Sequence, residues 1–222
     1  MEFISVFDVI GPNMIGPSSS HTAGAVRIAL LAGKMMHNRI VKADFILYKS
    51  FAETYRGHGT DRALTGGLLG FKTDNPKIRN SLEIAKERGL AVTFACNREE
   101  TDCHPNTVDI TMEDDRGYRM TVRGESLGGG KARITRINGV NVVLTGEYSS
   151  LLVVHTDYPG VLAHITDVLS SHHVNIAFLR LFRREKGGET YTIIESDDPV
   201  SVGAVADINK NQYIRDTIVL KE

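Results

Sequence analysis

The chain has 222 residues, a length that suits one or two compact domains and supplies enough apolar residues for a core. Apolar residues make up 41% of the sequence and charged residues 24%, and no run of about eighteen apolar residues predicts a membrane span, so we expect a soluble protein. The formal net charge is −1, with basic and acidic residues intermixed, which argues against binding to DNA or RNA.

The N-terminal segment MEFISVFDVI does not resemble a signal peptide, because it contains Glu2 and lacks a basic stretch and a small-residue cleavage site. We therefore expect a cytoplasmic protein. The two cysteines, Cys96 and Cys103, follow no common zinc spacing and are too few for a disulfide framework. We expect two reduced thiols there and no metal site within this chain.

The first two thirds of the chain predict a mixture of helices and strands. Apolar periodicity predicts a helix over residues 22–37, a strand over 44–51 and a helix over 61–69. A further helix has Asn75 as its N-cap, Pro76 in its first turn and Gly89 just past its end. Short strands are then expected over residues 90–96, 107–113, 117–124, 132–139 and 140–146, with a hairpin turn at 114–117.

The last third has the clearest periodicity. Strand patterns cover residues 149–159, 174–185, 190–196 and 213–221, and helical patterns cover 160–173 and 198–211. Asp198 is the expected N-cap of the second helix, and Pro199 its first-turn residue. The resulting order βαββαβ is that of a ferredoxin-like split unit. The fold class is therefore α+β, with an N-terminal mixed domain over residues 1–147 and a second domain over 148–222.

Two common catalytic motifs fit the sequence poorly. A nucleophile elbow requires glycine where Ser20 stands, which argues against a hydrolase. The segment ESLGGGKARI resembles a phosphate-binding loop, but Glu125 replaces the first glycine and Ala132 replaces the magnesium-binding serine or threonine. We therefore expect no nucleotide site, and the glycines at 128–130 indicate a bend or a close backbone approach.

Histidines precede or begin two predicted helices, among glycine and hydroxyl residues. One segment is GPSSSHTAG, with Ser18, Ser19, Ser20, His21 and Thr22; the other is RGHGTDRAL, with Gly57, His58, Gly59 and Thr60. A helix N-terminus attracts carboxylate or phosphate and disfavours imidazolium, so a neutral histidine there suits a general base. The alternative is that the serines only cap a helix, contributing about 1 kcal/mol, and that both histidines are surface residues.

Taken together, these segments resemble the beta subunit of the bacterial iron–sulfur-dependent L-serine dehydratases. The resemblance is carried by SVFDVIGPNMIGPSSSHTAGA, GHGTDRAL, HPNT and SLGGG with ITRING, while the region from residue 151 onward resembles an ACT domain, whose usual first turn is DYPGVLA. The N-terminal part is also similar to the allosteric substrate-binding domain of some phosphoglycerate dehydrogenases. The resemblance implies deamination of L-serine to pyruvate and ammonia, with a 4Fe-4S cluster as Lewis acid.

The resemblance also implies a chain that is catalytically incomplete alone. Such a cluster needs several cysteine thiolates, and this chain has two, so a separate alpha subunit would supply the ligands. The serine cluster would then form one wall of the shared active site, with His58 and Thr60 from the second segment. Either His21 or His58 could be the base; we favour His58 because its glycine neighbours leave it more approachable, and His21 could instead orient the carboxylate. His104 and Asn106 match the HPN motif without an assigned role, and a turn is the simplest interpretation.

For the ACT region, the resemblance implies a homodimer with an amino-acid site at its interface. Asp157 and Gly160 of the first turn would face Asn175 on the second strand, with Asp157 accepting from a ligand ammonium and Gly160 allowing close approach. The other histidines of the region are expected to be structural or solvated: His155, His164, His172 and His173. The alternative function is a freestanding regulatory protein whose domains bind serine or a related amino acid without chemistry.

Overall fold

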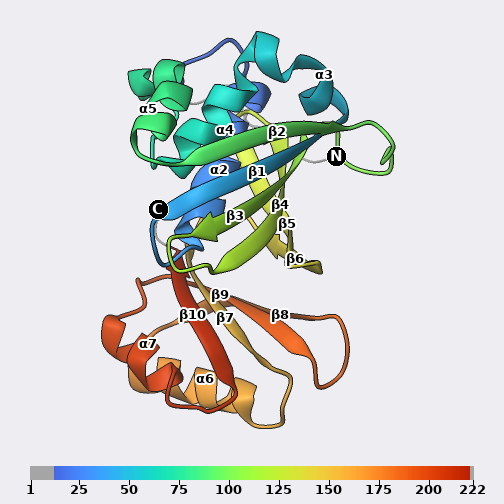
Figure 1. The fold of residues 1–222 in the computed structure, drawn as a ribbon. Coiled ribbons are helices and arrows are strands. Elements are labelled where there is room, and N and C mark those ends of the chain that lie inside the picture. Colours follow the sequence, from blue (N-terminus) through green and yellow to red (C-terminus); the bar gives the residue numbers. More distant parts are fainter. Residues whose placement is uncertain (1–12, 221–222) are drawn as a thin grey trace, which may run out of the picture. The chain divides into compact units, whose positions relative to one another are not determined.

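The computed structural model describes residues 13–220, so the N-terminal segment compared with a signal peptide lies outside the described residues. The chain divides into two compact units, with the division after Gly139. It contains two β-sheets, one of six strands and one of four (Figure 1). Within residues 13–220, no helix is long and apolar enough to cross a membrane. The expected α+β class, with an ACT-like fold at the C-terminus, is confirmed.

The larger sheet has six strands in the order β2-β1-β3-β4-β5-β6. Its strands are β1 (Ile40–Tyr48), β2 (Ala91–Asn97), β3 (Thr107–Asp114), β4 (Arg119–Gly128), β5 (Lys131–Ile137) and β6 (Val140–Leu144). β1 pairs in parallel with β2 and antiparallel with β3, after which β3, β4 and β5 form an antiparallel meander. The turn expected at 114–117 is the β3–β4 hairpin, where Gly117 has a positive φ.

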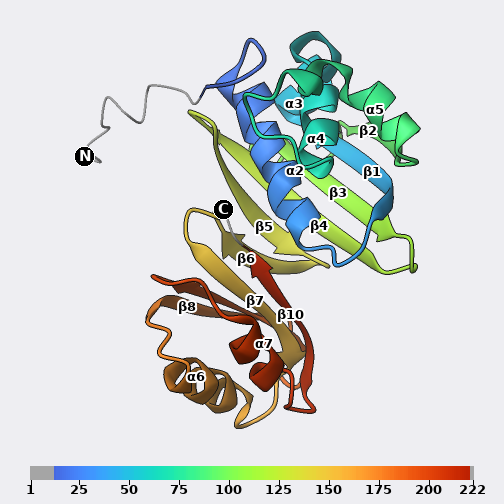
Figure 2. The same cartoon turned by 90° about the vertical axis from the view of Figure 1, so that its left-hand side faces the viewer.

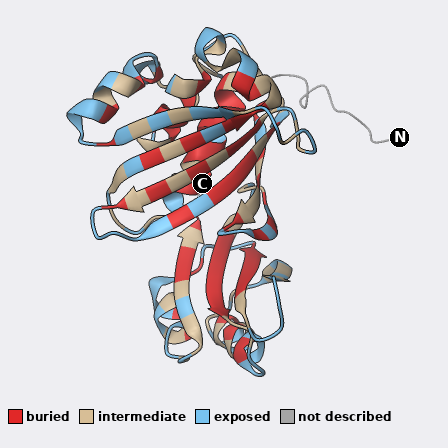
Figure 3. Cartoon of the chain, turned by 45° about the vertical axis from the view of Figure 1, so that its right-hand side comes forward, coloured by how far each residue is buried: buried red, intermediate tan, exposed pale blue. Residues whose placement is uncertain are grey.

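Helices cover one face of this sheet, as Figure 2 shows for α2 and α4. The helical elements of the first unit are η1 (Ser19–Gly24), α2 (Ala25–Lys34), α3 (Lys49–His58), α4 (Thr60–Leu68), η2 (Pro76–Asn80) and α5 (Ser81–Glu87). Alternation along β3 explains the packing, since Val108, Ile110 and Met112 are fully buried towards the helices, while the residues between them are only half-buried. Figure 3 shows the same alternation of buried and exposed positions along several strands.

The face of the sheet opposite the helices carries a buried charge network centred on Arg123. Its guanidinium donates to the Asp109 carboxylate at 2.6 and 2.8 Å, to Glu100 at 2.5 and 3.2 Å, and to the Tyr48 hydroxyl at 2.9 Å. Burial, together with the hydrogen bond to Asp109, raises the pKa of Tyr48 to about 12. Because Glu100 belongs to the irregular segment between β2 and β3, the network fixes that segment to the sheet.

Several element boundaries differ from those predicted. The first helix begins as the π-helical turn η1 and ends at Lys34, and β1 ends at Tyr48 because residues 49–58 form α3, a helix that was not predicted. The helix after Asn75 is split into η2 and α5, although its expected limits are confirmed. The Asn75 side chain accepts from the Lys77 N–H at 3.0 Å, and Gly89, just past the end, has φ +73°.

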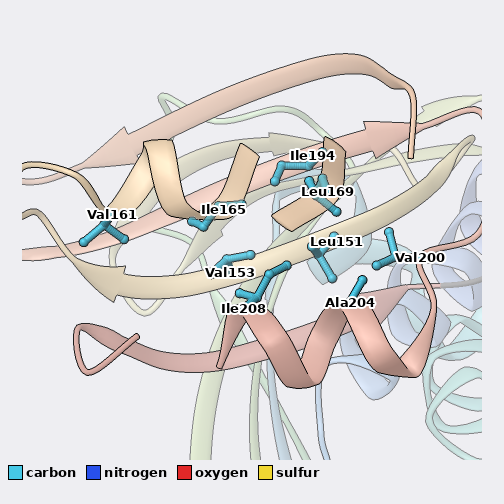
Figure 4. Close-up of a cluster of buried hydrophobic side chains, with 9 residues drawn as sticks. All are labelled: Leu151, Val153, Val161, Ile165, Leu169, Ile194, Val200, Ala204 and Ile208. Atoms are coloured by element: carbon cyan, nitrogen blue, oxygen red, sulfur yellow. The ribbon is translucent and has the colours of Figure 1, made fainter. Parts of the chain in front are cut away.

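The second unit contains a four-stranded antiparallel sheet in the order β10-β7-β9-β8, with two helices. Besides β6, its elements are β7 (Ser149–Thr156), α6 (Val161–Ser171), β8 (Ile176–Arg183), β9 (Glu189–Ser196), α7 (Val202–Ile208) and β10 (Ile214–Leu220). This is the predicted βαββαβ order. Figure 4 shows the apolar core between α6, α7 and the sheet, formed by Leu151, Val153, Val161, Ile165, Leu169, Ile194, Val200, Ala204 and Ile208.

One expected cap in this unit is wrong. The N-cap of α7 is Ser201, whose hydroxyl accepts from the Ala204 N–H at 3.1 Å, and the helix begins after both Asp198 and Pro199. Val200, just ahead of the helix, is buried in the core of the unit, whereas Asp198 and Pro199 are exposed.

Candidate functional site

The serine-rich segment forms the tight entry to the first helix. Ser18 is extended, with φ −137°, and its side-chain oxygen accepts from the His21 N–H at 3.2 Å, so it is an N-cap as the alternative interpretation required. The turn that follows, η1, is π-helical, a local geometry that occurs often at functional sites. It turns the His21 ring towards the start of α3, where the Ser50 hydroxyl lies 3.1 Å from His21 Nε2.

His58 lies directly before the start of a helix, as expected, but it is also the end of another helix that was not predicted. It is the last residue of α3, and Gly59 follows with φ +69° before α4 begins at Thr60. Glycine adopts this left-handed conformation without strain because it has no Cβ, which explains why a glycine directly follows the histidine. The expectation that Thr60 is the N-cap is wrong. The N-cap of α4 is Gly59, and Thr60 is the first residue of the helix, with a buried hydroxyl that has no hydrogen-bond partner among the described residues.

The structure brings the two histidines together despite their separation in sequence. The ring centroids of His21 and His58 are 4.7 Å apart in an edge-on arrangement, and the Phe51 ring lies 5.3 Å from the His21 ring. Burial, and secondarily the proximity of His58, lowers the pKa of His21, so its imidazole is neutral near pH 7. The two His21 ring nitrogens lie near the Ser18 and Ser50 hydroxyls, whereas His58 Nδ1 is buried without a partner in residues 13–220.

A chain of hydrogen bonds links the serine-rich turn to the SLGGG and HPN motifs. The Ser126 hydroxyl donates to the Ser20 carbonyl at 2.9 Å, and the Ser126 N–H donates to the Asn106 carbonyl at 3.0 Å. Asn106 in turn donates its backbone N–H to His104 Nδ1 at 3.2 Å. A Cβ at Gly24 would stand 1.9 Å from Ser126 Oγ, so this close approach requires glycine. His104 and Asn106 therefore support the serine-rich turn indirectly, through Ser126.

A cavity of about 220 Å³ opens beside His58. It is lined by Ile15, Gly16, Pro17, Thr22, Arg56, Gly57, His58, Gly59, Arg62, Ile78 and Arg79. Of the hydroxyl residues predicted to bind substrate, Thr22 lines the cavity. The lining does not include Ser18, which is the N-cap of η1, Ser19 and Ser20 within η1, or Thr60 in α4. Sequence reasoning missed Ser50 and the three arginines. Arg56 and Arg62 stand within RGHGTDRAL, so their charge was a signal that could have been used.

The two thiols of this chain each lie against a backbone carbonyl. Cys96 Sγ is 3.4 Å from the Ala52 carbonyl and Cys103 Sγ is 3.7 Å from the Glu100 carbonyl, while burial raises the pKa of the Cys103 thiol. Within the described residues, no three or more histidine, cysteine or acidic side chains group as metal ligands. The side chains present therefore do not fit an iron–sulfur cluster held by this chain.

In the second unit, the predicted effector residues do not meet within one chain. Asp157 follows β7, and its Oδ2 accepts from the Arg183 guanidinium at 2.5 Å and from the Gly187 N–H at 3.0 Å, contacts that lower its pKa. Asn175 precedes β8 and donates to Asp197 at 2.6 Å. Because β7 and β8 both pair antiparallel with β9, they run in the same direction, so Asp157 and Asn175 stand at opposite ends of the sheet.

Gly160 and the histidines of this unit have separate local roles. Gly160 has φ +89°, and a Cβ there would meet no atom within 4 Å, which leaves the turn open to close approach. His155 is buried between the Thr192 hydroxyl at 2.8 Å and the Thr156 carbonyl at 2.9 Å. His164 bonds the Ile208 carbonyl and His172 bonds the Asp207 carboxylate, both across to the region of α7, and His173 is exposed.

Comparisons with known proteins agree with this arrangement. A family model described as serine dehydratase beta chain matches residues 5–136, and one described as ACT domain matches residues 149–211. The fold and these matches define a two-domain protein in which an ACT domain follows a dehydratase-type domain. The chain belongs to the serine dehydratase beta chain family, and the resemblance seen in the sequence is confirmed.

Two relatives match almost end to end. The chain is 40% identical to the probable L-serine dehydratase beta chain of Bacillus subtilis, over 95% of this chain and 94% of that protein. It is also 40% identical to the L-serine dehydratase beta chain of Peptoniphilus asaccharolyticus, over 89% of each. By contrast, the match to the L-serine dehydratase of Haemophilus influenzae, at 38% identity, covers 57% of this chain and only 33% of that longer protein.

Proposed function

We propose that this chain is the beta subunit of an L-serine dehydratase, which converts L-serine to pyruvate and ammonia. The observation that carries the proposal is the match over nearly the full length of two L-serine dehydratase beta chains. The paired histidines beside a small cavity supply what such an elimination needs from a protein, namely an imidazole next to a space that a substrate can enter.

We assign His58 as the base. His21 would be a positioning residue beside it, since its ring nitrogens lie near the Ser18 and Ser50 hydroxyls. In the elimination, His58 takes the α-proton, the freed electron pair forms the Cα–Cβ double bond, and the β-hydroxyl leaves as water after gaining a proton. The aminoacrylate that results tautomerises and hydrolyses to pyruvate and ammonia. His58 is favoured because its buried Nδ1 lacks a partner among the described residues, whereas the ring nitrogens of His21 both lie near hydroxyls.

We further propose that an alpha subunit completes the site and carries a 4Fe-4S cluster. A cluster of this kind, when bound, acts as a Lewis acid that makes the β-hydroxyl a better leaving group. The beta-chain names of the two nearly full-length relatives support a partner chain, and so does the small share of the longer Haemophilus protein that this chain matches. Ser18, Ser19, Ser20, Thr22 and Thr60 would form the wall that this chain contributes around L-serine, in a cytoplasmic enzyme.

The ACT domain is proposed to form a homodimer through the edge strand β8. Phe178 and Leu181 on this strand are 46% and 37% exposed, which is unusual for large apolar side chains. If two copies of β8 pair antiparallel, the end that carries Asn175 in one copy meets the end near Asp157 in the other. Both hydrogen bonds of Asp157 described above are accepted by Oδ2, and Oδ1 would accept from a ligand ammonium such as that of serine.

The test is an anaerobic pull-down of the tagged chain from its native host, followed by iron and sulfide analysis and a pyruvate assay with L-serine. We expect a second protein, iron and sulfide in the complex, and pyruvate formation. A homo-oligomer without a partner, iron or pyruvate would contradict the proposal. It would favour the alternative of a freestanding amino-acid-binding regulator, which tight serine binding by the lone chain would then support.

A further inference from the structure

The cavity beside His58 has a rim of positive charge that no acidic side chain in the described part of the chain neutralises. Arg56 from α3, Arg62 from α4 and Arg79 from η2 all line it, and no acidic residue does. All three side chains are exposed, and no carboxylate in residues 13–220 forms an ion pair with any of them. Guanidinium groups remain charged at any physiological pH, so this opening attracts anions.

The interior of the cavity provides a second, independent observation. Thr22 lines the cavity and is 2% exposed, yet its hydroxyl has no hydrogen-bond partner among the described residues. A buried hydroxyl without a partner costs free energy unless something bonds to it, so a ligand oxygen or nitrogen that reached it would offset that cost. Unpartnered His58 Nδ1 offers another such position at the same cavity.

The size of the cavity limits the kind of anion. Its volume of about 220 Å³ lies below the range of about 300–1,000 Å³ that is typical of pockets for drug-sized ligands. A small metabolite with a single carboxylate fits this space. Arginine also matches a carboxylate geometrically, because its planar fork donates two parallel hydrogen bonds.

We propose that Arg62 and Arg79 bind the carboxylate of the amino-acid substrate at the mouth of this cavity, with Arg56 adding to the positive field. The inference rests on the proposed function, since it places the substrate of that reaction next to His58. It assigns this chain a role in specificity: an analogue that lacks the carboxylate, such as L-serinamide, leaves the arginines without a partner and is rejected.

The first experiment measures steady-state kinetics of the assembled enzyme with Arg62→Gln and Arg79→Gln. The matched control is Arg116→Gln, because Arg116 is also exposed but lies in the β3–β4 turn, outside the cavity lining. The carboxylate is bound before and during the reaction, so KM for L-serine should rise about tenfold or more in both cavity variants while kcat changes little. Arg62→Lys keeps the charge and should recover part of the loss.

The second experiment does not depend on catalysis. Thermal unfolding of the full chain alone is followed with pyruvate, L-serine or L-serinamide. Pyruvate and L-serine should raise the unfolding midpoint of the wild type, L-serinamide should not, and Arg62→Gln with Arg79→Gln should abolish the shift.

The outcomes separate the two claims. An assembled enzyme that turns over L-serine, but whose cavity variants keep a normal KM, overturns the carboxylate site and leaves the proposed function standing. Variants that lose the partner subunit in a pull-down, with normal KM in the enzyme that remains, also overturn it, because the arginines would then be docking residues. An enzyme inactive on L-serine contradicts the proposed function, and arginine-dependent pyruvate binding by the chain would still support an anion site.

Discussion

The ring of His21 lies edge-on to the ring of His58, with their centroids 4.7 Å apart, although the two residues come from different helical elements. The ring of Phe51, near the start of α3, also contacts the His21 ring edge-on, at a centroid distance of 5.3 Å. The pair therefore shares a partly apolar setting in which charge on one ring opposes charge on the other. This relationship separates the roles of the two side chains and leads to the first two predictions.

Replacing His58 should abolish turnover without disturbing assembly. In His58→Ala the α-proton has no acceptor, and the loss of a general base typically lowers the rate by about a hundredfold to ten-thousandfold. The assay is pyruvate formation by the assembled enzyme, with co-purification of the partner as the check on assembly. His173→Ala, an exposed histidine of the ACT domain, is the control. Near-normal turnover in His58→Ala would remove His58 from the mechanism.

The lowered pKa of His21 predicts a stability that falls in acid. Histidine ordinarily titrates near pH 6.5, so below about that pH the unfolded chain takes up a proton that folded His21 resists. The stabilising contribution is thus complete above the ordinary pKa and is lost as the pH falls through the lowered one. Urea unfolding between pH 7.5 and pH 5 measures this slope, and His21→Asn should flatten it relative to wild type and to His173→Asn. An unchanged slope would contradict the burial argument.

The close approach of Gly24 to Ser126 predicts a steric cost. In Gly24→Ala the new methyl group would overlap Ser126 Oγ and Cβ, at 1.9 and 2.7 Å, so we expect a loss of about 1 to 3 kcal/mol in the free energy of unfolding. The loss should shrink in a Ser126→Gly background, where both atoms are gone. Gly57→Ala is the matched control: no atom lies within 4 Å of a Cβ there, and alanine in a helix should be neutral or stabilising. Equal effects of Gly24→Ala and Gly57→Ala on urea unfolding would show that the contact does not matter.

The exposed apolar residues of β8 predict a dimer that a charge would disrupt. Phe178→Glu places a carboxylate on the edge strand and should shift the chain towards monomer, as measured by light scattering across a concentration series. Val202→Glu is the control, because Val202 is 86% exposed at the start of α7 and away from β8. A dimer that survives Phe178→Glu would place the interface elsewhere.

Local sequence patterns predicted the ACT region well because each of its elements follows a simple rule. Strand β7 contains the apolar run Leu151–Val154, α6 repeats its apolar residues at helical spacing, and Gly187 and Gly188 mark the turn between β8 and β9. Helix α3 was missed for the opposite reason. Only Phe51 and Ala52 of its ten residues are buried, so no apolar period distinguishes it from a loop.

The site was predicted in part. The two histidine motifs were recognised, but their contact depends on how η1 lies against α3, which is a tertiary effect. The same holds for Arg79, which reaches the cavity from η2, a segment without any catalytic motif. Ser50 was hidden for a related reason, because residues 49–51 were assigned to a strand and its hydroxyl was therefore not placed near His21.

The segment between β2 and β3 has little regular secondary structure, yet it is tied down along its length. Lys49 Nζ donates to the carbonyls of Thr101 and Cys103, both at 3.1 Å, and the Arg123 network and the Asn106–Ser126 bonds hold the two ends. This segment, which supports the serine-rich turn through Ser126, is therefore preorganised in the lone chain. Little ordering entropy remains to be lost there when the subunits dock, so association at that turn should resemble the meeting of two rigid bodies.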